Sequence, residues 1–124
     1  MIISTHGARF YGGQIDRIDN GLRELGHLVN VDQYNVDLIY CNDESHYSDA
    51  IYTKTYNKHA KLILNVLDVP TFIPEWAKIA PEWRSRLLLS DKVTSISKFT
   101  QNSLKESLGM DSICIYNPVK KVYS

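Results

Sequence analysis

Two adjacent glycines, Gly12 and Gly13, stand just before an apolar stripe at helical spacing. Backbone N–H groups at such a helix start can approach an anion with no side chain in the way, and the helix dipole adds a modest attraction. A tight turn that needs positive φ explains the two glycines equally well. The surrounding sequence is neither G-x-G-x-x-G nor a Walker lysine loop, so the usual dinucleotide and triphosphate fingerprints are missing.

Four further candidates follow predicted strands. Asp68 follows an apolar run, and its carboxylate could hydrogen-bond sugar hydroxyls or take a proton, although a helix cap or a loop-internal hydrogen bond explains it slightly better. His6 lies in the first loop, where a polar histidine is more often exposed than catalytic. Ser97 and Lys98 begin a helix, and capping already accounts for Ser97. The four histidines show no metal spacing, so we predict no metal and no cofactor.

Strands and helices alternate along the whole chain and must position these loops. Ile15, Ile18 and Leu22 recur at three- and four-residue steps and predict a helix from Gln14, with Gly26 as its stop. A helix capped by Ser45 is expected next. Two short helices from Pro74 and Pro81, or one helix that kinks at Pro81, are expected after that, and a last helix from Ser97 to Gly109. Apolar or alternating runs predict strands at residues 1–5, 28–33, 36–42, 61–70, 91–97 and 112–118.

This alternation is typical of the α/β class. We expect a single Rossmann-like domain with a doubly wound, mostly parallel sheet of about six strands and helices on both faces. The length of 124 residues suits one such domain. Ligands bind at the carboxyl ends of the strands in open parallel sheets. The candidate loops are therefore residues 5–13, 42–45, 68–72 and 97–100.

Composition narrows the partners and the compartment. Fourteen basic and fourteen acidic residues cancel, which argues against the basic face that duplex nucleic acid requires. Cys41 and Cys114 sit in apolar runs and read as free core thiols in a reducing cytoplasm. No apolar run approaches the ~18 residues of a membrane span, and no signal peptide is visible. Lys54, Lys58 and Lys61 could form a small basic ridge suited to anionic lipid, but an ordinary solvated face explains them better. Peripheral membrane contact and a homodimer both stay open as alternatives.

Three stretches together resemble the N-terminal domain of GT-B fold glycosyltransferases, within the retaining family 4. YGGQIDRIDNGLRELGHLVNV is similar to the family's glycine-glycine turn, first helix and second strand. SDKVTSISKFTQNSLKESLG is similar to its strand ending in serine and the helix that ends in Leu-Gly. IYNPV stands where the family has an N-G-V connector, with Pro118 in place of the glycine. The matches span nearly the whole chain.

The resemblance implies that residues 1–117 form an acceptor-side domain and that residues 118–124 are a connector to an absent C-terminal, donor-binding domain. Such enzymes transfer a hexose from a nucleotide-sugar, here a co-substrate, to a hydroxyl of a glycan or lipid acceptor. By position, Gly12 and Gly13 would face the donor phosphates, and His6, Ser97 and Lys98 would lie near the cleft. Asp68 occupies a cleft loop where family members often carry histidine or aspartate. The chain alone is expected to be inactive.

Two other classes stay open. A receiver-like signalling domain has this length and alternation, with Asp68 compared to its strand-ending aspartate and Lys98 to its lysine. It would need an acidic pair after the first strand to seat magnesium, and THGARF stands there instead. A non-catalytic binding module that keeps the fold without the chemistry is the second alternative.

Overall fold

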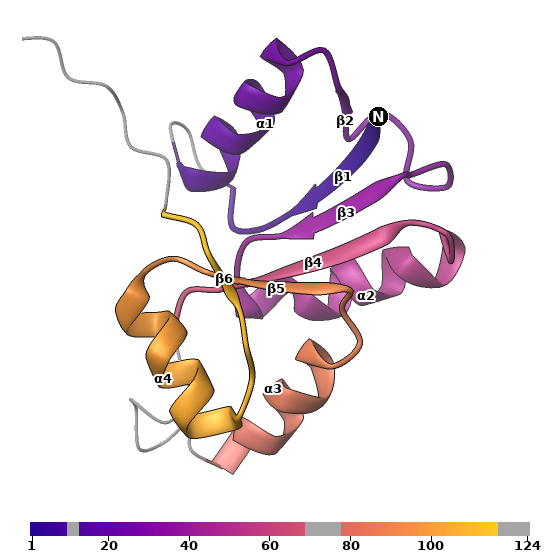
Figure 1. Cartoon of the computed structure of the whole chain (residues 1–124). Helices are drawn as coiled ribbons and strands as arrows, with labels where there is room; N and C mark the ends of the chain where they lie inside the picture. Colours follow the sequence, from indigo (N-terminus) through magenta and orange to yellow (C-terminus); the bar gives the residue numbers. More distant parts are fainter. Residues whose placement is uncertain (10–12, 69–77, 117–124) are drawn as a thin grey trace, which may run out of the picture.

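The computed structural model describes residues 1–9, 13–68 and 78–116 and has an α/β fold (Figure 1). Six strands form one sheet in the order β2-β1-β3-β4-β5-β6, and every neighbouring pair is parallel. Their bounds are β1 (Ile2–His6), β2 (Leu28–Val29), β3 (Leu38–Cys41), β4 (Lys61–Val66), β5 (Lys92–Ser95) and β6 (Ile113–Cys114). The predicted Rossmann-like class is therefore confirmed.

Helices cover both faces of this sheet. Figure 1 shows α1 above the sheet and the other three helices below it. The chain steps from β1 to β2 in one direction and from β3 to β6 in the other, so right-handed crossovers place the helices on opposite faces. The helices are α1 (Gln14–Glu24), α2 (Tyr47–Tyr56), α3 (Ala80–Leu87) and α4 (Lys98–Leu108), with a 3-10 turn, η1 (Glu44–His46), before α2.

The helix ends follow local sequence signals. Ser97 caps α4, since its Oγ accepts the Thr100 N–H at 3.1 Å, and Gly109 ends that helix in the left-handed conformation. Gly26 has a φ of +92° directly after the C-cap of α1. Pro81 lies in the first turn of α3, where its missing N–H costs no hydrogen bond. These predicted boundaries are confirmed.

Other boundaries differ from the sequence-based prediction. The predicted Ser45 cap is wrong, because Ser45 lies inside η1 and His46 is the N-cap of α2. The second strand stops at Val29, since Asn30 takes a φ of +57° and turns the chain. Cys41 is buried, but Cys114 is only partly so. Gly12, the helix predicted from Pro74 up to residue 77, and the connector 118–124 lie outside the described residues.

The main core lies between the sheet and helices α2 to α4. Ile39, Leu62, Leu64 and Tyr47 are fully buried there, together with Leu104 of α4. Burial raises the pKa of the Cys41 thiol in this core to about 12, so it stays a neutral thiol. No helix in the described ranges is long and apolar enough to cross a membrane.

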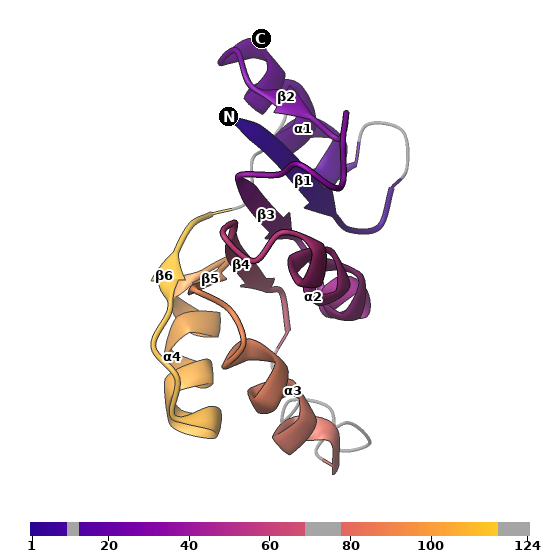
Figure 2. The same ribbon diagram turned by 90° about the vertical axis from the view of Figure 1, so that its right-hand side faces the viewer.

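The face under α1 is only partly covered. A hollow of about 380 Å³ lies beside α1. Most of its lining is apolar: Ile3, Ile18, Leu22, Leu38, Tyr40, Ile63, Ile115 and Tyr116, with Gln14, Asn65 and Thr94 as polar members. Figure 2 shows the sheet from the side, with α2 and α3 on the face away from α1. Among the described residues, the lining of this hollow is mainly apolar and includes no charged side chain.

Candidate functional site

The order of the strands places a crevice between β1 and β3. These two strands are neighbours, but the chain leaves β1 toward α1 on one face and leaves β3 toward α2 on the other. The loops after the two strands therefore diverge, and ligands of open α/β sheets bind at this point. The relevant loops are the glycine-bearing loop after His6 and the acidic loop Asn42–Glu44.

Asp43 ties these two loops together. Its Oδ2 accepts the backbone N–H of Ala8 at 2.8 Å, and its Oδ1 lies 2.6 Å from Nδ1 of His46. The loops also approach closely at Gly7, where an added Cβ would lie 3.1 Å from Cβ of Asn42. Asp43 is 8% exposed. A buried carboxylate thus holds the start of the glycine-bearing loop against the end of β3.

Glu44 makes the corresponding link to β4. Its Oε1 accepts the backbone N–H groups of Leu67 at 2.8 Å and Asp68 at 3.0 Å. Burial raises the pKa of the Glu44 carboxyl, while the hydrogen bonds from Asp68, Glu44 and Leu67 N–H groups oppose that rise. The position of the Asp68 backbone therefore depends on a side chain 24 residues earlier in the chain.

A cleft of about 490 Å³ opens at this edge of the sheet. It is lined by Ala8, Asp43, Glu44, Ser45, Leu67, Asp68, Ile79, Trp83, and Arg86. Trp83 is nearly buried and packs edge-on to Tyr47, with ring centroids 6.5 Å apart. The guanidinium of Arg86 donates to Oε1 of Glu82 at 2.6 Å. The cleft thus combines acceptors, a donor and an aromatic ring, which suits a polar ligand with an apolar face.

Of the candidates predicted from sequence, Asp68 lines this cleft, and its side chain is exposed. Gly13 is the buried N-cap of α1, and its carbonyl accepts the N–H of Arg17 at 3.1 Å. Its φ of −76° and ψ of 177° are open to any residue, so Gly13 is not required for positive φ. Gly12 lies outside the described residues.

The remaining candidates lie apart from the cleft lining. His6 is the last residue of β1 and not the loop residue that the sequence predicted. Its Nε2 is 2.9 Å from Oγ of Ser4 on the same strand and 3.3 Å from Oγ1 of Thr53 on α2. Burial lowers the pKa of His6. Ser97 serves as the cap of α4, and the exposed Lys98 donates to Gln101 at 3.3 Å. The structure therefore brings Asp68 together with Asp43 and Glu44, and does not bring His6, Ser97 or Lys98 into that group.

A second buried polar cluster supports the glycine-bearing loop from the α1 side. The Thr5 hydroxyl donates to Oδ1 of Asp19 at 2.6 Å, and accepts from Arg9 at 2.9 Å and from Asn30 at 2.8 Å. Arg9 also forms an ion pair with Asp19 at 2.5 Å. Asp19 is 3% exposed, so its charge is neutralised inside the fold rather than in solvent. Arg9, which follows Gly7 and Ala8, is thereby anchored to α1.

Sequence reasoning named the loop 42–45 but not Asp43 and Glu44 individually. Their position could have identified them, because they are two acidic residues directly after a predicted strand, where ligands of parallel sheets bind. Asp19 also left a signal, since it lies four residues after Ile15 in the apolar stripe of α1. The sequence holds no signal that Trp83 and Arg86 line the cleft, because only the docking of α3 brings them there.

No protein-family model and no curated protein matches this chain. Within residues 1–9, 13–68 and 78–116, no group of three or more His, Cys, Asp or Glu side chains is placed to hold a metal ion.

Proposed function

We propose that this chain is the N-terminal, acceptor-side domain of a nucleotide-sugar-dependent glycosyltransferase with a GT-B fold. Joined to a donor-binding domain, it would hold a glycan or lipid acceptor while a hexose is transferred to an acceptor hydroxyl. The observation that carries the proposal is the cleft at the carboxyl edge, where Asp43, Glu44 and Asp68 gather beside Trp83 and Arg86. On its own the chain would transfer no sugar.

The chemistry of a sugar matches this lining. Carboxylates accept hydrogen bonds from hydroxyl groups, a guanidinium donates to ring and hydroxyl oxygens, and an aromatic ring packs on the apolar C–H face of a sugar. Asp68 is the exposed carboxylate of the group. We assign it the role of binding or deprotonating the acceptor hydroxyl.

Gly13 supports the donor side of the same proposal. It stands at the N-terminus of an eleven-residue helix, where backbone N–H groups and the helix dipole favour an anion. The resemblance described above assigns this turn to the donor phosphates. The second domain would supply most of the remaining contacts to the nucleotide.

Titration of the ¹⁵N-labelled chain by NMR tests the proposal. The ligands are a panel of mono- and disaccharides and, separately, nucleoside diphosphate-sugars. We expect saccharides to shift the amides of Ala8, Asp43 and Asp68, and nucleotide-sugars to shift Gly13 only weakly. Asp68→Asn and Arg86→Gln should each weaken saccharide binding about fivefold or more, the loss of roughly one hydrogen bond to a charged group.

Arg84→Gln is the matched control. Arg84 lies on the same helix, but its Nε donates to the carbonyl of Leu108, away from the cleft lining. If millimolar saccharides and nucleotide-sugars leave all of these amides unmoved, the acceptor-domain proposal fails and the binding-module alternative replaces it. An equal loss of saccharide affinity in Arg86→Gln and Arg84→Gln would mean that the cleft is not the binding site.

A further inference from the structure

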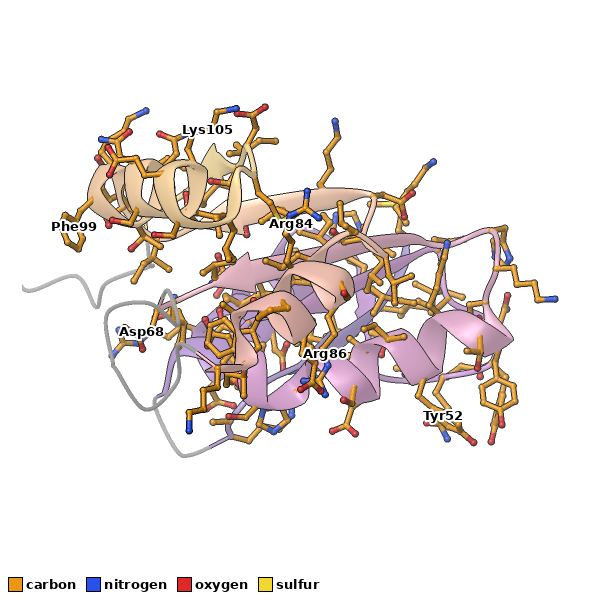
Figure 3. All side chains as sticks on the ribbon, turned by 90° about the horizontal axis from the view of Figure 1, so that it is seen from below. Tyr52, Asp68, Arg84, Arg86, Phe99 and Lys105 are labelled. Carbon is orange, nitrogen blue, oxygen red and sulfur yellow. The ribbon has the colours of Figure 1, made fainter. Side chains whose placement is uncertain are left out.

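Three exposed tyrosines gather at the end of the molecule away from the cleft. Tyr34 precedes β3, and Tyr52 and Tyr56 lie one turn apart on α2. Their exposed fractions are 66%, 62% and 51%. Figure 3 shows Tyr52 at the opposite end of the molecule from Asp68. Such exposed aromatic surface is not needed to complete the core.

The rings stand nearly perpendicular to one another. Tyr56 meets Tyr34 at a centroid distance of 5.5 Å and an angle of 83°, and meets Tyr52 at 5.1 Å and 77°. The hydroxyls of Tyr52 and Tyr56 are 2.6 Å apart, within hydrogen-bond distance. The three rings, with Gln33 and Thr53, line a hollow of about 40 Å³. That volume admits a head group of a few atoms, but not a sugar ring.

The electrostatics around the hollow favour a cation. The face of an aromatic ring carries the negative part of its quadrupole and attracts ammonium groups within about 6 Å. Asp32 adds a carboxylate beside the cluster, since its Oδ1 accepts the N–H of Tyr34 at 2.8 Å. The ammonium of Lys54, on the same helix as two of the rings, donates to the carbonyls of Lys58 and Ala60 and does not line the hollow.

We propose that Tyr34, Tyr52 and Tyr56 form an aromatic cage that binds a methylated ammonium group. A quaternary ammonium group is bulky and weakly hydrated, so it loses little on leaving water and is attracted by several ring faces at once. Charge, and not shape alone, carries this binding. The site is remote from the carboxyl-edge cleft and does not depend on the proposed function.

Choline and its uncharged isostere 3,3-dimethylbutan-1-ol separate charge from shape. Each is titrated into the full chain while ring ¹H–¹³C NMR signals of the tyrosines are recorded. We expect choline to shift the signals of all three tyrosines with a Kd on the order of 1–10 mM. The neutral alcohol should bind at least about fivefold more weakly, because it lacks the attraction to the ring faces.

Variants of Tyr52 identify the cage itself. Tyr52→Phe keeps the ring and should retain choline binding within about threefold, whereas Tyr52→Leu should weaken it at least about fivefold. Tyr116→Leu is the control, since Tyr116 is 65% exposed and lies outside the cage. Amide spectra of the variants check that the fold is kept.

Three results would overturn the proposal. The first is equal affinity for choline and the alcohol, which would make the cluster an apolar patch. The second is unchanged choline affinity in folded Tyr52→Leu. The third is the absence of any tyrosine shift at about 50 mM choline, well above the expected Kd.

Discussion

The carboxylate of Asp43 accepts the backbone N–H of Ala8 at 2.8 Å, across 35 residues of sequence. One side chain thereby joins the loop after β1 to the loop after β3, the two loops that diverge at the crevice. Its second oxygen lies 2.6 Å from Nδ1 of His46. Asp43 is thus bonded on both oxygens, and the geometry of the cleft depends on it.

Replacing Asp43 tests this link. Asp43→Ala should lower the free energy of unfolding by about 1–3 kcal/mol, because the N–H of Ala8 loses its acceptor in a partly buried site. The amide of Ala8 should also exchange faster with solvent. Urea unfolding and hydrogen exchange measure the two effects. Asp43→Asn, which keeps an acceptor oxygen, is expected to lower the free energy of unfolding by less. An Ala8 amide that stays protected from exchange in Asp43→Ala would argue against the link.

Replacing Thr5 is predicted to destabilise the fold more than the small size of its side chain suggests. Its hydroxyl bonds to Asp19, Arg9 and Asn30, so Thr5→Val leaves a buried carboxylate short of one donor. The free energy of unfolding should fall by about 1–3 kcal/mol, measured by chemical denaturation.

Thr55→Val controls for the change from threonine to valine, because Thr55 is exposed and its hydroxyl donates to a local carbonyl, that of Tyr52. It should change the unfolding free energy by less than about 0.5 kcal/mol. A similar effect at both positions would show that the buried network adds nothing to stability.

His6 should make the fold weaker in mild acid. Burial lowers the pKa of His6 from its ordinary value of 6.5, so the unfolded chain binds more protons than the folded one between the two pKa values. Stability therefore falls as pH drops below 6.5 and stops falling below the folded-state pKa.

Denaturation of the wild type and His6→Gln between pH 8 and 5 measures the pH-dependent contribution of His6 to stability, since the other three histidines are common to both proteins. The stability difference between the two proteins should shift in favour of His6→Gln on acidification. A difference that does not change with pH would mean that His6 protonates equally well in the folded and unfolded chains.

The cap of α4 offers a local test. Ser97→Ala removes the acceptor for the N–H of Thr100 and should cost about 1 kcal/mol, measured from the thermal midpoint and urea unfolding. Ser48→Ala, at an exposed position on α2, should be neutral or slightly stabilising, because alanine has the higher helix propensity. Equal behaviour at the two serines would contradict the capping role.

Local signals predicted the helices well where caps and periodicity agree. The glycine stops at Gly26 and Gly109, the cap at Ser97 and the proline start of α3 depend on backbone geometry within a few residues. The sequence-based prediction failed where a distant partner competes with the local preference. Asn30 ends β2 early because its side chain pairs with Thr5 of β1, and no signal near Asn30 reports that contact.

The candidate site divides in the same way. Asp68 was predicted because it directly follows an apolar strand, and parallel strands end at one edge of the sheet. Its neighbours Trp83 and Arg86 reach the cleft only through the packing of α3. The α/β class, the alternation of elements and the loops that carry polar residues are determined by the sequence alone, because periodicity and caps act over short distances. The tertiary structure decided that Asp43 and Glu44 hold the cleft together and that three tyrosines meet at the far end, because strand order and helix docking set which distant residues touch.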